Sequence, residues 1–277
     1  MRRITLADGR SVPALGLGTW RMGEDRQARA AEVAALRAGI EAGATLVDTA
    51  EMYADGGAEE VVGEAIRGRR DEVFIVSKVL PSNATRRGVA RACEGSLRRL
   101  GTDRLDLYLL HWVGDVPFEE TLRGFEDLVQ AGKILGFGVS NLDLASLETW
   151  LALPGGARTL VDQVMYHVGE RGIEHDLLPF CAGQGIAVMA YCPLAQGSLP
   201  RERALREVAA RHGRTPAQVM LAWTLRQPNV IAIPKSARPE RVRENVAAVD
   251  LALSSEDLAL LDRAFPPPRG PQPLATT

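Results

Sequence analysis

Four side chains of complementary chemistry stand at or just past the ends of apolar runs in this sequence. Asp48 follows TLV and Tyr53 comes five residues later, Lys78 ends FIVSK, and His111 ends LDLYLLH. A nearby ammonium stabilises a phenolate, and a carboxylate on that ammonium keeps it charged. We expect Lys78 to lower the pKa of Tyr53 from its usual value of about 10 by roughly two to three units. Such a phenol can protonate an oxygen on which negative charge develops, while a neutral imidazole donates a hydrogen bond to it. The four groups together suit carbonyl reduction, with hydride arriving at carbon and the proton coming from Tyr53.

The polar residues that end successive apolar runs recur at intervals of 23 to 33 residues. This spacing fits one strand and one helix per interval, so these residues occupy equivalent places on successive strands. In a (β/α)8 barrel such positions meet at the carboxyl end of the strands, where active sites of that fold lie. Taken singly, each residue has an ordinary interpretation, such as a turn aromatic, a solvated strand end or a core histidine. The joint pattern favours a site. Its members in order are Asp48, Lys78, His111, Ser140, Gln163 and Tyr191.

The elements that must position these residues alternate along the chain. Continuously apolar runs, typical of strands covered on both faces, begin the units, and amphipathic helical patterns follow them. Helices are expected over 28–43, 84–101 and 214–227, with glycines ending the first two and Thr215 as N-cap of the third. Eight such units predict a (β/α)8 TIM barrel. An open doubly wound sheet is the alternative, but no G-x-G-x-x-G occurs among 27 glycines. The expected strands cover residues 14–19, 45–50, 73–78, 105–111, 134–140, 160–166, 186–194 and 230–236.

Both ends of the chain depart from this alternation. Residues 2–15 read as an N-terminal β-hairpin that turns at Asp8–Gly9 and covers the bottom of the barrel. The proline-rich residues 265–277 cannot continue a helix and are expected to form an irregular or disordered C-terminal arm. We find no linker, so we expect residues 1–277 to form a single domain.

Composition excludes several classes of function. The chain has 277 residues, 46% of them hydrophobic, and a formal net charge of −2, which argues against nucleic acid or an anionic membrane as partner. Three cysteines without a C-x-x-C predict reduced thiols, and we expect neither a signal peptide nor a membrane-spanning run. Four histidines form no H-E-x-x-H, so we expect no metal. We expect a cytoplasmic monomer that acts on a small molecule.

Over almost its whole length the sequence resembles the aldo-keto reductases. LGLGTW matches the family's first strand, DTAEMYADGGAEEVVGEAI its segment around the catalytic acid and tyrosine, and IVSKV and LLHW its lysine and histidine segments. GFGVSN, VDQVMYH, AYCPLAQG and IPKSARPERVRENV match its cofactor-binding segments in the same order. The resemblance implies a (β/α)8 barrel that binds NADPH in an extended form without a Rossmann domain.

The resemblance also implies roles for individual residues. Asp48, Tyr53, Lys78 and His111 would be the catalytic tetrad. Ser140, Asn141 and Gln163 would hold the nicotinamide carboxamide, Tyr191 would stack on the ring, and Leu194, Gln196, Gly197 and Ser198 would lie along the pyrophosphate. Lys235, Ser236, Arg238 and Arg241 would surround the 2′-phosphate, with Glu244 and Asn245 on the adenine. Cations after a strand and at a helix start suit an anion, although a solvated basic helix start is the ordinary alternative.

Two departures from the family bear on the substrate. The segment after Tyr191 is short, so the cofactor is expected to leave more quickly, and the chain ends soon after its last helix. We therefore expect an open pocket for small carbonyls. The resemblance of GTWRMGE and DTAEMYADGGAE to bacterial members of the family, together with these short loops, favours 2-oxoaldehydes such as methylglyoxal. The walls of the pocket would be Trp20, Met22, Met52 and Trp112.

Other functions remain as alternatives. A short-chain dehydrogenase would carry Y-x-x-x-K, which is absent here, and a barrel isomerase or lyase would carry a glycine-rich phosphate site instead of these four residues. The non-enzymatic alternative is a cofactor-sensing regulatory barrel with weak turnover. It predicts a large exposed apolar patch or an added assembly segment.

Overall fold

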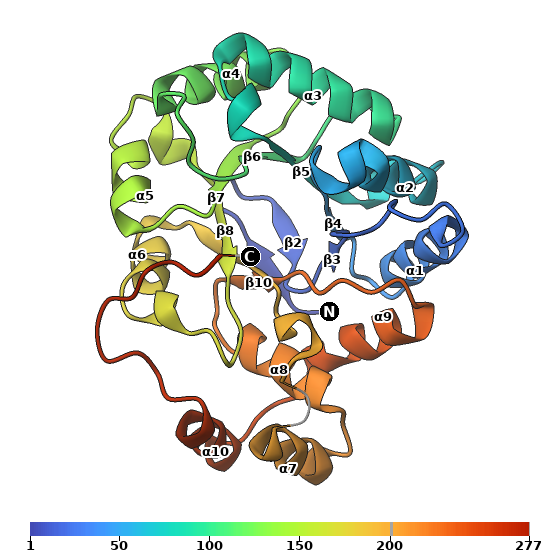
Figure 1. Ribbon diagram of the computed structural model, residues 1–277, viewed down its shortest axis with the longest axis vertical. Helices are drawn as coiled ribbons and strands as arrows, with labels where there is room; N and C mark the ends of the chain where they lie inside the picture. Colours follow the sequence, from blue (N-terminus) through green and yellow to red (C-terminus); the bar gives the residue numbers. More distant parts are fainter. Residues whose placement is uncertain (200–201, 277) are drawn as a thin grey trace.

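The computed structural model describes residues 1–199 and 202–276, and its centre is a barrel of eight parallel strands whose order in the sheet is their order along the chain (Figure 1). Bonds between the first and last strands close the sheet: the Gly16 amide donates to Ala232 O at 2.8 Å, and Gly18 is bridged to Lys235. A side chain at Gly18 would put its Cβ 2.7 Å from Ile233 O, so the close approach of the two strands requires glycine. The predicted (β/α)8 barrel is confirmed. Its strands are β3 (Leu17–Gly18), β4 (Leu46–Asp48), β5 (Phe74–Val79), β6 (Leu107–Leu110), β7 (Phe137–Ser140), β8 (Val161–Met165), β9 (Ala187–Tyr191) and β10 (Val230–Ala232).

A ring of helices surrounds the barrel (Figure 1). The predicted caps are present: Gly101 ends α3 at φ +64°, and Thr215 closes a capping box with Gln218 at the start of α8. One continuous apolar core fills the barrel and the space between strands and helices. The helices are α1 (Arg29–Glu41), α2 (Gly57–Ala65), α3 (Arg86–Leu100), α4 (Phe118–Gln130), α5 (Leu144–Leu151), α6 (Leu177–Gln184), α7 (Arg203–His212), α8 (Pro216–Leu225), α9 (Pro239–Val246) and α10 (Ser255–Ala264).

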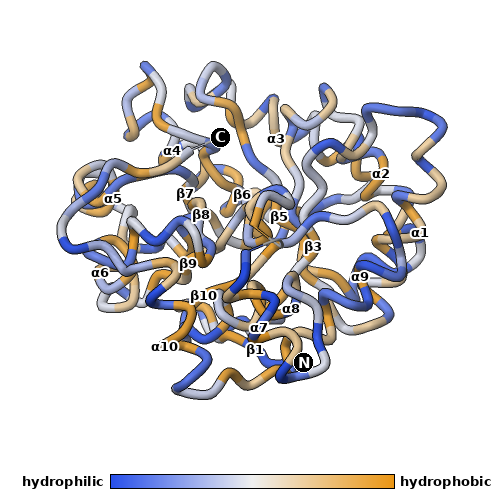
Figure 2. Tube along the Cα trace, turned by 60° about the horizontal axis from the view of Figure 1, so that its bottom comes forward, coloured by the Kyte–Doolittle hydropathy of each residue, from blue (hydrophilic) through white to orange (hydrophobic). Residues whose placement is uncertain are grey.

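The N-terminal hairpin forms as expected. Strands β1 (Arg3–Thr5) and β2 (Ser11–Pro13) pair antiparallel, and Gly9 takes a φ of +86° in the turn. The hairpin buries Ile4 and Val12 and lies at the end of the barrel opposite the C-terminus (Figure 2). It therefore closes the bottom and leaves the other end for a site.

The C-terminal arm is irregular, as predicted, but side-chain contacts fix its start and its end lies at the groove. Arg171 donates to Phe265 O at 2.6 Å and pairs with Asp262 at 2.7 Å, which ties the start of the arm to the loop that follows β8. From there the arm returns to the mouth of the barrel, where Thr276 lines the central groove (Figure 1). The end of the arm therefore contributes to the wall of the mouth, although Thr276 was not among the expected wall residues. No helix in the part of the chain described here is long and apolar enough to cross a membrane.

Candidate active site

A groove of about 1070 Å³ opens at the carboxyl ends of the strands. It begins at the barrel axis beside Asp48 and Tyr53 and continues to the starts of α8 and α9. Residues from successive strand ends line it, as their spacing in the sequence predicted. This is the place where barrels of this type build their sites.

Three of the four proposed catalytic side chains form one hydrogen-bonded chain. Lys78 Nζ lies 2.9 Å from Asp48 Oδ2, 2.9 Å from Thr49 O and 3.1 Å from Tyr53 Oη. The lysine is fully buried, so it lies beneath the groove and not on its wall. His111 lines the groove, with its ring edge-to-face against the Tyr53 ring at a centroid distance of 5.7 Å.

The bonds of Lys78 determine where the phenolic proton points. An ammonium has three N–H groups, and here all three have acceptors, namely a carboxylate, a carbonyl and the phenol oxygen. Because Tyr53 Oη accepts from Lys78, its own O–H is free to point elsewhere. The side chain lines the groove, so the proton can face a bound molecule.

Burial sets the protonation states of the site. It raises the pKa of Tyr53 above its usual value, and the opposing effect of Lys78 is smaller; the expected lowering of this pKa is wrong for the protein at rest. Burial disfavours the charge of Lys78, but Asp48 and Tyr53 outweigh it and raise the pKa of the ammonium. Burial and then Lys78 lower the pKa of His111 to about 2, so the imidazole is neutral at physiological pH.

The tautomer of His111 follows from its surroundings. Its Nδ1 is buried without a hydrogen-bond partner in the described structure. A buried N–H without an acceptor is rarer in proteins than an acceptor without a donor, so we place the proton on Nε2. That nitrogen can then donate to an oxygen beside Tyr53.

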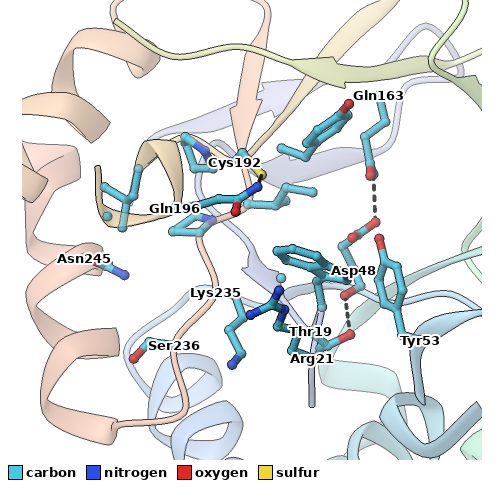
Figure 3. Close-up of a pocket in the computed structure, with 18 of the residues that line it drawn as sticks. Thr19, Arg21, Asp48, Tyr53, Gln163, Cys192, Gln196, Lys235, Ser236 and Asn245 are labelled. Atoms are coloured by element: carbon cyan, nitrogen blue, oxygen red, sulfur yellow. Dashed lines mark hydrogen bonds between the residues drawn. The ribbon is translucent and has the colours of Figure 1, made fainter. Parts of the chain in front are cut away.

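The wall next to the tetrad carries amides, a hydroxyl and an aromatic ring. Asn141 Nδ2 donates to His111 O at 3.0 Å and to Ser140 Oγ at 3.1 Å, and Tyr191 Oη donates to Asn141 Oδ1 at 2.8 Å. Gln163 Nε2 donates to Asp48 Oδ1 at 2.7 Å (Figure 3), and no described residue donates to Gln163 Oε1. Ring and amide groups in this order fit a planar ring that carries a carboxamide.

The other end of the groove is cationic. Lys235 and Arg241 line it, together with Ser236, Glu244 and Asn245. In the described part of the chain no carboxylate pairs with Lys235, whereas Arg241 bonds both oxygens of Glu244, at 3.2 and 2.9 Å. An ammonium and a guanidinium near the start of α9 suit a phosphate group. The groove therefore fits an extended dinucleotide with its phosphates toward this end.

Not every predicted cofactor residue reaches the groove wall. Leu194, Gln196 and Gly197 line it, but Ser198 is exposed outside it and donates to Ala195 O at 2.8 Å within its own turn. Arg238 is the exposed N-cap residue of α9 and also lies off the wall. The structure therefore does not bring Ser198 and Arg238 together with the others.

The mouth of the groove differs from the prediction at one residue. Trp20, Met52 and Trp112 line it as expected, but Met22 is fully buried in the core and is not on the wall. Arg21 takes a left-handed φ of +65°, which turns the chain so that its own side chain points into the groove (Figure 3) and Met22 turns inward. From the sequence, several other residues were not assigned to the groove wall. Of those named next, only Thr215 had been singled out, and it was expected as a helix cap. They include Thr19, Arg21, Val113, Cys192, Thr215 and Thr276.

Backbone strain is concentrated around this groove. Seven non-glycine residues of the described chain have positive φ angles, and all seven lie in loops that follow β3, β4, β7 and β9. Each such conformation costs of order 1–3 kcal/mol, and such residues cluster at functional sites. They are Arg21, Ala54, Asp55, Asn141, Cys192, Ala195 and Gln196.

Comparison with known proteins agrees with this geometry. Residues 14–265 match the model of the aldo/keto reductase family. The chain belongs to the aldo/keto reductase family. It is 55% identical to methylglyoxal reductase YeaE of Escherichia coli over 265 residues, which are 94% of this chain and 93% of that protein. It is 36% identical to glyoxal reductase of Bacillus subtilis over 98% of this chain and 95% of that protein.

Solved structures of other aldo/keto reductases share the fold. One from Klebsiella pneumoniae, in complex with NADP and acetate, superposes with a TM-score of 0.97 at 52% identity and covers 99% of each chain. Another from the same organism, in complex with NADPH, gives a TM-score of 0.96 at 52% identity over 100% of this chain and 99% of that one. These relatives match the chain over nearly its full length. The match therefore includes the strand ends that carry Asp48, Lys78 and His111.

Proposed function

We propose that this aldo/keto reductase reduces small aldehydes and ketones with NADPH, and that 2-oxoaldehydes such as methylglyoxal are its favoured substrates. The observation that carries the proposal is the bonding of Lys78: its three N–H groups are occupied, and the proton of Tyr53 is left to face the groove. A relative with more than half of its residues identical is a methylglyoxal reductase, and relatives of the same fold bind NADP or NADPH.

In this proposal each of the four catalytic residues has a distinct task. Bound NADPH supplies the hydride to the carbonyl carbon. Tyr53 Oη transfers its proton to the carbonyl oxygen, and the neutral His111 donates a hydrogen bond to the same oxygen. Lys78 stabilises the phenolate that forms, at a distance of 3.1 Å, while Asp48 keeps the ammonium charged and in place. The product is the alcohol.

The cofactor-binding roles are proposals as well. Ser140, Asn141 and Gln163 would contact the carboxamide and Tyr191 the nicotinamide ring. Leu194, Gln196 and Gly197 would follow the pyrophosphate, whereas Ser198 and Arg238 would lie outside the path of the cofactor. Lys235, Ser236 and Arg241 would bind the 2′-phosphate, and Glu244 and Asn245 the adenine; all five line the cationic end of the groove.

The substrate class follows from the mouth of the groove. Trp20, Met52, Trp112 and Val113 give it apolar walls, and the end of the C-terminal arm limits its width at Thr276. Such a mouth admits small uncharged carbonyl compounds. A regulatory barrel finds no support: of the large apolar side chains in the described chain, four are exposed, and two of these, Met52 and Val113, line the groove. We also propose that the protein is a cytoplasmic monomer. Size-exclusion chromatography with light scattering tests its oligomeric state.

The deciding experiment is NADPH oxidation with methylglyoxal, wild type beside Tyr53→Phe. We expect the variant to lose activity by about 10²- to 10⁴-fold, the usual contribution of a general acid, while NADPH binding by fluorescence titration stays within about twofold. Tyr108→Phe is the matched control, because Tyr108 is fully buried and lies away from the groove. Equal losses in both variants, or loss of NADPH binding by Tyr53→Phe, would refute the proposed role of the phenol.

A further inference from the structure

Gln163 joins two opposite walls of the barrel. It lies on β8 and donates from Nε2 to Asp48 Oδ1 on β4, at 2.7 Å, although three strands separate β8 from β4 in the sheet. Both side chains are buried, with exposures of 1% for Gln163 and 2% for Asp48. Figure 3 shows the amide reaching across the interior to the carboxylate.

The neighbours of this amide fix which way round it lies. A carboxylate only accepts hydrogen bonds, and the same Nε2 also lies 2.8 Å from Met189 Sδ, a weak acceptor. If the amide were turned over, its oxygen would face a carboxylate oxygen and a sulfur, with no donor between them. The nitrogen end is therefore held toward Asp48, and Oε1 is the end that remains for a ligand in the groove.

Asp48 in turn depends on two donors. Lys78 occupies Oδ2 at 2.9 Å and Gln163 occupies Oδ1 at 2.7 Å. A buried carboxylate oxygen without its donor is destabilised, so loss of the amide would leave Asp48 free to turn or to draw Lys78 toward itself. Lys78 would then move away from Tyr53, which it contacts at 3.1 Å.

We propose that Gln163 is a positioning residue for Asp48: its amide holds the carboxylate that holds Lys78 against Tyr53, in addition to lining the nicotinamide end of the groove. This inference rests on the proposed reductase function. The two tasks use different atoms, since Nε2 serves the tetrad and Oε1 serves the groove. Asp48 and the cofactor would therefore be coupled through a single amide.

Gln163→Glu separates these tasks, because a carboxylate keeps the shape and the accepting oxygen but loses the donor to Asp48. If Gln163 only accepted a hydrogen bond from a carboxamide N–H, glutamate would serve as well, and kcat at saturating NADPH would be unchanged. We expect kcat to fall by at least tenfold at pH 7.5. We also expect the ratio of variant to wild-type kcat to rise as the pH falls toward 5, because the introduced carboxyl group regains an O–H donor when it is protonated. The titratable group that contacts this position is Asp48; Asp48 is bonded to Lys78, and Lys78 is bonded to Tyr53.

Gln163→Met is the second variant and Gln184→Met the control. Methionine matches the length of glutamine without a donor, so we expect the same fall in kcat but no recovery at low pH. Gln184 is exposed at the end of α6 and is not on the groove wall, so Gln184→Met is expected to leave NADPH binding, kcat and the pH profile as in wild type. Binding is measured by NADPH fluorescence and folding by thermal unfolding.

The outcomes are distinct. If the wild type turns over and either Gln163 variant has an unchanged kcat at saturating NADPH, the positioning role is overturned. The proposed reductase function is then unaffected. Absence of turnover in the wild type would count against the proposed function itself. A fall in kcat in both variants, with recovery at low pH only in Gln163→Glu, supports the inference.

Discussion

Arg241 provides a quantitative test of which cofactor the groove accepts. In the structure its guanidinium bonds both oxygens of Glu244, and 55% of its side chain is exposed. A charge-assisted hydrogen bond to a 2′-phosphate is worth about 1.5–3 kcal/mol. To make it, Arg241 gives up an exposed ion pair worth about 0.3–0.5 kcal/mol. The net contribution is about 1–2.5 kcal/mol, which corresponds to a factor of about 5 to 60 in the dissociation constant of NADPH.

The assay is fluorescence titration of Arg241→Ala with NADPH and with NADH. We expect the loss for NADPH alone, since NADH has no 2′-phosphate and its dissociation constant should change by less than about twofold. Arg243→Ala is the control, because it removes an exposed arginine from the same helix that is not on the groove wall. Glu244 keeps its bond from Thr215 Oγ1, at 2.7 Å, so the start of α8 is preserved. Equal weakening of both cofactors, or no weakening, would refute the assignment of Arg241 to the phosphate.

Two further predictions concern pH. Because the pKa of His111 is lowered to about 2, its imidazole stays neutral well below the usual 6.5, and kcat for reduction should show no inflection between pH 5 and 8; a fall centred near 6.5 would contradict this. Burial raises the pKa of Asp162 from 3.8 to about 8. Between these two pH values the folded protein keeps a proton that the unfolded chain releases. The free energy of unfolding therefore falls as the pH rises through this range, by at most about 1.4 kcal/mol per pH unit. Asp162→Asn should therefore leave Tm nearly unchanged at pH 4 and raise it by several degrees at pH 8, measured by calorimetry. The exposed Asp115→Asn is the control, and a difference that does not grow with pH would count against the buried, protonated carboxyl.

The repeated strand–helix unit explains why so much of the site was predictable. Each strand must be apolar until it reaches the rim, so a polar residue at its end is visible in the sequence, and the regular length of the unit places these residues on one ring. Asp48, Lys78 and His111 were found in this way, and the structure brings them together with Tyr53. The expected helix caps at Gly101 and Thr215 depend only on local chemistry and are likewise present.

The features that the sequence did not predict depend on tertiary contacts. Met22 was assigned to the pocket because nothing in RMGE indicates that Arg21 takes the left-handed conformation. This conformation places the Arg21 side chain in the groove and buries Met22 in the core. The path of the C-terminal arm is fixed by Arg171, which lies far from it in sequence. The direction of the pKa shift of Tyr53 depends on how deeply the ring is buried, which residue types alone do not give.

The raised pKa of Tyr53 is consistent with its role as an acid. Asp48 and Lys78 form a buried pair without net charge, so at rest they offer the phenol little electrostatic help against burial, and the proton stays on Oη. The ammonium is nevertheless at hydrogen-bond distance, 3.1 Å, and the carboxylate is on its other side. As Tyr53 gives up its proton, its contact with the fully buried ammonium of Lys78 becomes a hydrogen-bonded ion pair between opposite charges. The stabilisation therefore appears during the reaction and not before it, which is the condition for an interaction to raise kcat. A site that ionised Tyr53 at rest would have lost the proton that carbonyl reduction requires.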